Sequence, residues 1–253
     1  MDPKFRFTDR VTSYVRGRPG YPAELIKLLR AECGLNPTSV VADVGSGTGI
    51  LSKMLCEVAK TVYGVEPNWA MRETGRSFLA DNHNFISVEG AAEDTTLEGT
   101  SVDLITVAQA FHWFHPTDTR HEFLRILKPN GWAAIIYNDR ILEGSRLGEA
   151  YEKLLEQFGI DYHQVKKKGK AVVADLEPFF GHSDFKKATF PNQQYFDREG
   201  FIERVTSASY MPNRNHPQYR LMLDAVKRIF FENYQGGHVV LDQETNVYYG
   251  QMT

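Results

Sequence analysis

Three glycines at alternate positions in the stretch VVADVGSGTGI, residues 40–50, carry the clearest chemical signal in the sequence. Glycine lets a ligand approach the backbone closely and adopts left-handed conformations without steric cost. A phosphate-binding P-loop ends in Gly-Lys-Ser or Gly-Lys-Thr, whereas Ile50 follows Gly49 here, so this class of loop is excluded. A dinucleotide-binding loop has the spacing G-x-G-x-x-G, whereas Gly45, Gly47 and Gly49 stand at every second position. That difference alone does not decide between a dinucleotide and another ligand.

Two acidic residues next to the loop narrow the choice of ligand. Asp43 lies just before Gly45, at the end of an expected strand. A carboxylate there repels a pyrophosphate and suits a ligand that carries an amine or a sulfonium. Glu66 closes the second expected strand, where an acid can accept hydrogen bonds from both ribose hydroxyls. We therefore expect a nucleoside with a cationic tail, and a nicotinamide oxidoreductase is disfavoured.

Alternating strands and helices must position these residues. Helical patterns separate the expected strands, with Asn68 as the N-cap of one helix and a Pro-Asn-Gly stop at the end of a helix over 121–131. Such an alternation predicts right-handed crossovers and an α/β fold with a parallel sheet that is covered on both faces. The strands are expected at 39–44, 61–66, 85–90, 102–108 and 132–138.

The flanking regions differ from this pattern. Pro22 suits the first turn of a helix before the sheet. We expect a single domain over 1–253, with a core of about 38–140 plus 181–253. The N-terminal arm, 1–37, and a helical insertion, about 141–235, are expected to cap it. Within these regions the patterns predict helices at 147–158, 199–207 and 217–234, an extended segment FKKATF and a terminal hairpin in HVVLDQETNVYYGQM. The KKKGK run (166–170) is expected to be a solvated loop, and the alternative is that it attracts an acidic substrate near the mouth of the cleft.

Composition limits the class of protein. The 253 residues are 42% hydrophobic with a formal net charge of −3, which allows a sizeable core and does not indicate a nucleic-acid partner. The only two cysteines, Cys33 and Cys56, do not suggest a disulfide framework. We find no signal-peptide pattern and no apolar run that approaches membrane-spanning length, so a cytoplasmic protein without a membrane partner is expected. The sequence does not distinguish a monomer from a homodimer.

Five segments, in order, resemble the successive motifs of class I S-adenosylmethionine (SAM) methyltransferases. They are VVADVGSGTGI, GVEP, GAAEDTTL, VDLITVAQAFHWF and LRILKPNGWAAIIYN, within about 38–140. The arm YVRGRPGYP and the segment AFHWF are similar to the branch of trans-aconitate methyltransferase and related small-molecule enzymes. The resemblance implies a Rossmann-like, doubly wound sheet of order 3-2-1-4-5-7-6 with strand 7 antiparallel. It also implies SAM as cofactor and S-adenosylhomocysteine as product.

The resemblance also implies a role for each matching residue. Asp43 would orient the amino group of SAM, Glu66 would bind the ribose hydroxyls, and the arm would meet the SAM carboxylate. The implied cofactor-binding residues are Tyr14, Arg18, Asp43, Gly45, Ser46, Gly47, Thr48, Gly49, Glu66, Pro67, Ala92, Glu93, Asp94, Ala108 and Gln109.

Ligands of open parallel sheets bind where the strand order reverses, here at strands 1 and 4. The fourth strand ends in AQAFHWFH, in which His112 is the candidate general base and otherwise orients the substrate or packs on Trp113. Trp113, His115 and Tyr210 are the expected substrate contacts. A metal site is disfavoured, because Pro116 opposes helix at His115 and so separates the histidines from one helical face.

The acceptor is expected to be a small molecule. O-methylation of a carboxylic acid is favoured over a hydroxyl or amine, because arginines in the arm and the later helices could grip an anion. A methyltransferase acting on RNA or protein and a non-catalytic SAM-binding protein stay open as alternatives. The arginines in question are Arg10, Arg16, Arg18, Arg204, Arg214 and Arg220.

Overall fold

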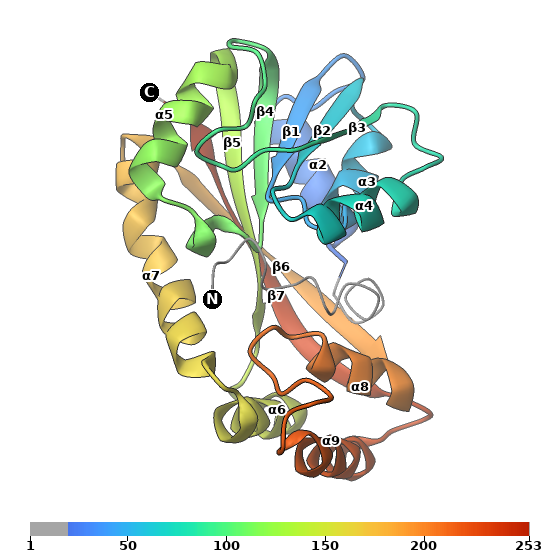
Figure 1. Cartoon of the computed structure of the whole chain (residues 1–253). Coiled ribbons are helices and arrows are strands. Elements are labelled where there is room, and N and C mark those ends of the chain that lie inside the picture. Colours follow the sequence, from blue (N-terminus) through green and yellow to red (C-terminus); the bar gives the residue numbers. More distant parts are fainter. Residues whose placement is uncertain (1–19, 253) are drawn as a thin grey trace.

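A seven-stranded sheet forms the centre of the computed structural model, which describes residues 20–252 and only the backbone of 168–172. Its strand order is β3-β2-β1-β4-β5-β7-β6, and β7 runs antiparallel to both of its neighbours, as predicted. Figure 1 shows the strands side by side. The strands are β1 (Val40–Val44), β2 (Thr61–Val65), β3 (Phe85–Val88), β4 (Val102–Ala108), β5 (Leu127–Arg140), β6 (Lys186–Phe196) and β7 (Val239–Gln251).

Helices cover both faces of the parallel part of the sheet. On one face, α2 (Ala23–Glu32) and α3 (Ile50–Cys56) bury leucines such as Leu29 and Leu55 against β1, β4 and β5. On the other face, α5 (Pro116–Ile126) and α7 (Tyr162–Phe180) bury phenylalanines such as Phe123 and Phe179. The central strands β1 and β4 are therefore mostly buried on both sides, which explains their continuous hydrophobic runs. The remaining helix of this half is α4 (Trp69–Phe78), capped by Asn68 as predicted.

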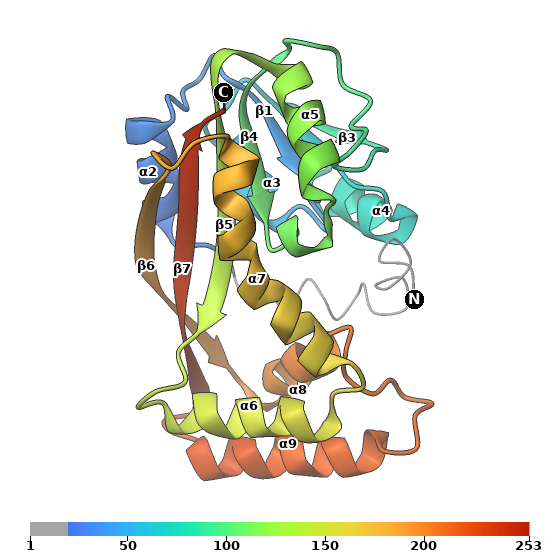
Figure 2. The same cartoon turned by 90° about the vertical axis from the view of Figure 1, so that its left-hand side faces the viewer.

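A second apolar core lies at the far end of β6 and β7. It is built by α6 (Arg146–Phe158), α8 (Arg198–Thr206) and α9 (Tyr219–Asn233), which bury residues such as Tyr151, Phe201 and Val226. Phe196 and Leu241 bring the two strands into this core. In Figure 2, α6 and α9 lie side by side beneath the end of the sheet. We call this helical part, α6 with α8 and α9, the cap.

The prediction of a terminal hairpin was wrong. Residues 239–251 form one continuous strand, which pairs with β5 on one side and β6 on the other. The polar segment that looked like a turn is held in the strand by cross-strand hydrogen bonds. Thr245 Oγ1 donates to Asn138 Oδ1 at 2.6 Å, and Asn246 Nδ2 donates to Asp139 Oδ2 at 2.8 Å. Polar residues stay in the sheet because their partners come from a strand that is distant in sequence.

Two further local predictions were wrong. The KKKGK segment lies inside α7 and not in a loop, and Lys166 from it pairs with Glu152 at 2.6 Å and Glu156 at 3.0 Å. The helix expected over 121–131 instead covers Pro116–Ile126, and β5 begins at Leu127. A register shift between β4 and β5 lets the Pro-Asn-Gly turn sit within the strand, where Asn130 takes φ 64°.

Both cysteines, Cys33 and Cys56, are buried and unbonded. Among the described residues, no helix has the length and apolar character needed to cross a membrane.

Candidate active site

The glycine loop lies where the strand order reverses, between β1 and β4. Its glycines take left-handed conformations, with φ 70° at Gly45, 57° at Gly47 and 82° at Gly49. A Cβ added at Gly45 would lie 2.6 Å from the Cβ of Ala110, so no other residue fits there. The chain therefore turns sharply at the end of β1 and leaves backbone groups of the loop facing outward.

Two buried carboxylates underlie the loop. Asp43 is 1% exposed, and it accepts hydrogen bonds from Ser52 Oγ at 2.6 Å and Thr106 Oγ1 at 2.9 Å. Burial raises the pKa of Asp43 to about 6 despite these hydrogen bonds. Glu66 accepts from the backbone N–H groups of Gly47 and Asn68, each at 2.9 Å. Burial also raises the pKa of Glu66 above its usual value.

A cavity of about 550 Å³ extends from the glycine loop to the cap. Asp43, Gly45, Gly47 and Thr48 line its loop end. Thr48 Oγ1 is buried there and has no hydrogen-bond partner among the described residues. A buried hydroxyl without a partner is costly unless a ligand satisfies it.

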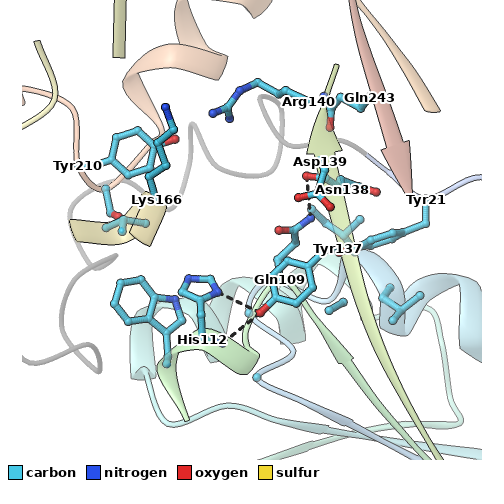
Figure 3. Close-up of a pocket in the computed structure, with 18 of the residues that line it drawn as sticks. Tyr21, Gln109, His112, Tyr137, Asn138, Asp139, Arg140, Lys166, Tyr210 and Gln243 are labelled. Atoms are coloured by element: carbon cyan, nitrogen blue, oxygen red, sulfur yellow. Dashed lines mark hydrogen bonds between the residues drawn. The ribbon is translucent and has the colours of Figure 1, made fainter. Parts of the chain in front are cut away.

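Aromatic and amide side chains line the middle of the cavity (Figure 3). Gln109 follows β4 with a left-handed φ of 59°, which is unusual for a residue with a side chain. The short helix η3 (Phe111–Trp113) then turns His112 and Trp113 to the cavity, their rings 4.6 Å apart. Tyr137 Oη lies 3.0 Å from the backbone nitrogen of His112 and 3.2 Å from its Nδ1.

Charged residues dominate the end of the cavity nearest the cap. Arg140 Nη2 lies 3.0 Å from Glu152 Oε2 and donates to Tyr162 Oη at 2.8 Å. Lys166 pairs with the same Glu152, and Arg204 is only 4% exposed. In Figure 3, Arg140, Lys166 and Tyr210 lie in the upper part of the view, and His112 and Tyr137 lie in the lower part.

Comparison with known proteins gives the family. A methyltransferase domain family matches residues 42–135. An uncharacterized methyltransferase of Mycobacterium tuberculosis is 32% identical over 209 residues, which cover 83% of this chain and 79% of that protein. This chain is a class I SAM-dependent methyltransferase.

Solved structures share the fold of this methyltransferase. A candidate methyltransferase from an antibiotic biosynthesis pathway in Anabaena variabilis superposes with a TM-score of 0.61 at 18% identity, over 92% of this chain and 98% of that one. A SAM-dependent methyltransferase of Aquifex aeolicus gives a TM-score of 0.50 at 18% identity, over 75% of this chain and 92% of that one.

The loop end of the cavity fits SAM. Gly45 and Gly47 give the ligand access to the backbone, and the partnerless Thr48 hydroxyl offers a further hydrogen bond. Asp43 lines this end and Glu66 lies beneath Gly47, so two carboxylates would stand near a cofactor that carries an amine, a sulfonium and a ribose. The chemistry of this donor set therefore agrees with the cofactor of the family.

About half of the predicted site residues line the cavity of the methyltransferase. Glu93 Oε1 accepts the backbone N–H of His115 at 2.8 Å, and the His115 side chain is 77% exposed beside Asp118. Tyr14, Arg10, Arg16 and Arg18 lie outside the described residues. The predicted residues that line the cavity are Asp43, Gly45, Ser46, Gly47, Thr48, Ala108, Gln109, His112, Trp113, Arg204 and Tyr210. Those outside its lining are Gly49, Glu66, Pro67, Ala92, Glu93, Asp94, His115, Arg214 and Arg220.

Several lining residues on β5, β7, α6 and α7 were not among the predicted site residues. The polar run Tyr137–Arg140 ends the apolar strand WAAII, and this change of character was a usable signal. Glu152 and Tyr162 show no such signal, because they are ordinary polar positions of helices. Lys166 belongs to the KKKGK run, for which attraction of an acidic substrate was the alternative to a solvated loop. The missed lining residues include Tyr21, Tyr137, Asn138, Asp139, Arg140, Glu152, Tyr162, Gln243 and Tyr248.

Proposed function

We propose that this methyltransferase transfers the methyl group of SAM to a carboxylate oxygen of a small organic acid. The observation that carries the proposal is the group of cations in the same cavity as the glycine loop. Arg140, Lys166 and Arg204 line the end next to the cap, where Glu152 is the acidic side chain that pairs with two of them. An anion that enters this end meets three cationic side chains in a partly dry site.

Arg140 is the main candidate for contact with the acid. Its guanidinium uses Nη2 for Glu152 and Tyr162, whereas its buried Nε has no hydrogen-bond partner among the described residues. A guanidinium presents its N–H groups in a planar fork that matches a carboxylate. An acceptor carboxylate would satisfy the remaining donor at little cost in side-chain ordering, since the contact with Glu152 already holds Arg140 in place.

A carboxylate also suits the chemistry of the middle of the cavity. Bound SAM supplies an electrophilic methyl group on a sulfonium. A carboxylate is ionised at neutral pH and attacks without losing a proton, so the residues near it need only align it and exclude water. The rings of His112, Trp113 and Tyr137 fit that task. The resemblance of AFHWF to the trans-aconitate branch supports a small acid as well.

Transfer of radiolabelled methyl from SAM to a panel of small acids tests the proposal. Methyl esters release volatile labelled methanol in brief mild alkali, and we expect this product. Arg140→Met should lower kcat/KM for the acid at least tenfold, since it removes a charge-assisted contact. Arg140→Lys should retain part of the activity, and Arg198→Met, at an exposed ion pair with Glu199, should change nothing.

Other outcomes contradict the proposal in distinct ways. Alkali-stable label would show a hydroxyl, amine or carbon acceptor. Label that appears only on added RNA or protein would replace the small acid as substrate. Tight SAM binding without transfer to any acid, amine, alcohol or macromolecule would favour a SAM-binding protein without catalysis.

A further inference from the structure

The guanidinium of Arg72, on α4, packs against the turn that follows β2. Its Nη1 donates to the backbone carbonyl of Glu66 at 3.0 Å and to that of Pro67 at 3.4 Å. Its Nη2 pairs at 2.7 Å with Glu89, the residue after β3, whose side chain is exposed. The side chain of Arg72 is only 10% exposed. Arg72 therefore ties the first turn of α4 to the chain between β2 and α4.

The same turn carries the carboxylate of Glu66. Oε1 of Glu66 accepts the backbone N–H of Asn68, and Oε2 accepts that of Gly47, each at 2.9 Å. Gly47 lines the cavity, and Glu66 lies beneath it with 9% of its surface exposed. An ionised carboxylate has roughly four lone-pair positions, so these two contacts leave room for hydroxyl groups of a ligand.

One peptide unit links Arg72 to this carboxylate. The carbonyl of Pro67 and the N–H of Asn68 belong to the same planar trans peptide, so they point in opposite directions. The carbonyl faces the guanidinium of Arg72, and the N–H faces Oε1 of Glu66. A rotation of this unit would weaken both contacts. Arg72 therefore restrains the orientation of the Glu66 carboxylate through the backbone.

Charge acts in the same direction as this geometry. Burial raises the pKa of Glu66, and the nearby Asp43 adds to that effect. The backbone N–H groups of Asn68 and Gly47 and the charge of Arg72 oppose it. An ionised carboxylate uses both oxygens as acceptors, whereas a protonated acid gives up part of that capacity. Arg72 therefore favours the form of Glu66 that can accept hydrogen bonds from hydroxyl groups.

We propose that Arg72 is a positioning residue, which holds the carboxylate of Glu66 toward the ribose hydroxyls of SAM and so gives the enzyme its preference for ribose over deoxyribose. An acid at the end of the second strand accepts hydrogen bonds from ribose hydroxyls in dinucleotide-binding sheets of related topology. The proposal rests on Glu66 as the ribose contact. It is independent of the methyl acceptor, because Glu66 and Arg72 lie on the side of the cofactor.

Titration calorimetry of the full-length protein tests this role without any acceptor. The two probes are S-adenosylhomocysteine and its 2′-deoxy analogue, which differ by one hydroxyl. We expect the wild-type protein to bind the ribose form at least about tenfold more tightly, the effect of one charge-assisted hydrogen bond. In Arg72→Met, this preference should fall below about threefold. Arg76→Met is the matched control on α4, because Arg76 is 62% exposed and pairs with Glu73, and it should keep the preference.

Two further variants separate positioning from a general structural effect. Arg72→Lys keeps the charge but lacks the planar fork, so an intermediate preference is expected. Glu66→Gln should lose the preference by itself. Addition of Arg72→Met to Glu66→Gln should then change the ratio of the two Kd values by less than about twofold, because Arg72 acts through Glu66.

Several outcomes would overturn the proposal. Equal losses of affinity for both probes in Arg72→Met would make Arg72 a structural residue only, and in a case where this variant does not fold, equal losses in Arg72→Lys would decide the same way. A wild-type protein that binds both probes equally would remove Glu66 as the contact of the 2′-hydroxyl. Independent losses in the double variant would show that Arg72 does not act through Glu66. Alkali-stable methyl products, in contrast, would remove the carboxylic acid as acceptor and leave the role of Arg72 intact.

Discussion

Backbone conformation and close contacts allow few substitutions at individual positions in and next to the glycine loop. Gly45 combines a left-handed backbone with a neighbour that touches the place of its missing Cβ. Asp43 keeps a carboxylate fully buried because two hydroxyls donate to it. Both choices keep the loop end of the cavity open and negatively charged, which suits the cation of the cofactor.

Gly45→Ala should weaken SAM binding. The added methyl group would lie 2.6 Å from Ala110 and 3.1 Å from Phe114, so the loop must move. We expect the Kd of SAM to rise more than tenfold and the unfolding free energy to fall by about 1–3 kcal/mol. Gly144→Ala is the matched control, because Gly144 has a similar φ of 75° and nothing within 4 Å of the added atom. Equal effects in titration calorimetry and urea unfolding would show that backbone strain alone matters.

Asp43 should make stability fall as pH rises from about 4 to 6. Its pKa is raised in the folded state, so the folded protein holds the proton more tightly than the unfolded chain, and the stabilising effect belongs to low pH. A rise from 3.8 to about 6 corresponds to about 3 kcal/mol. Asp43→Asn should remove this slope in urea unfolding at pH 4, 5, 6 and 7 and weaken SAM binding. Asp224→Asn, at an exposed residue, should keep the wild-type slope.

Whole elements meet at the charged end of the cavity. Arg140 ends β5, Glu152 lies on α6, and Tyr162 and Lys166 lie in α7. Their hydrogen bonds therefore join the end of β5 to α6 and α7. Sequence periodicity predicts each helix or strand separately and does not indicate such a meeting point, because it depends on how the elements pack.

Glu152→Gln should separate stability from acceptor binding. Loss of the charge weakens contacts to Arg140 and Lys166, so the unfolding free energy should fall by about 1–3 kcal/mol at pH 7. The same change leaves more positive charge in the cavity, so the KM of an anionic acceptor should fall.

Paired contacts also lower the pKa of Glu152, so its stabilising effect is present at neutral pH and is lost as pH falls below 4.5. Glu199→Gln, at an exposed ion pair, should change neither the unfolding free energy nor the KM of the acid. A KM that rises in Glu152→Gln would contradict the proposed acid.

At the scale of the whole molecule, two apolar cores share one cavity. The sheet core carries the glycine loop, and the cap core, with Tyr151, Phe201 and Val226, carries Arg204 and Glu152. The strands β1 to β5 could be predicted from the sequence, because they alternate with helices that lie next to them in the chain. The sequence was insufficient for β7, where Gln243, Thr245 and Asn246 are held by partners on β5 and β6. The change from apolar to polar residues at the end of β5 was a usable signal for Arg140, but no local feature shows that its guanidinium is buried.

A cavity in the cap core should affect the acceptor more than the cofactor. Phe201 is fully buried, and Phe201→Ala should lower the unfolding free energy by about 3–5 kcal/mol. We expect the KM of the acid to rise while the Kd of SAM stays within about threefold. Leu55→Ala, in α3 behind the glycine loop, should instead raise the Kd of SAM more than the KM of the acid. Equal effects of both variants on both ligands, in calorimetry and steady-state kinetics, would show that the two cores respond as one.

One strand carries both the residue that holds His112 and the residue that meets the cap, since Tyr137 and Arg140 belong to β5. A strand advances about 3.3 Å per residue, so the backbone separation of these two positions is about 10 Å. That spacing is covalent and does not change when helices shift. The fixed distance along β5 should therefore limit the length of the acceptor. Among acids of equal charge, we expect the enzyme to discriminate mainly by chain length.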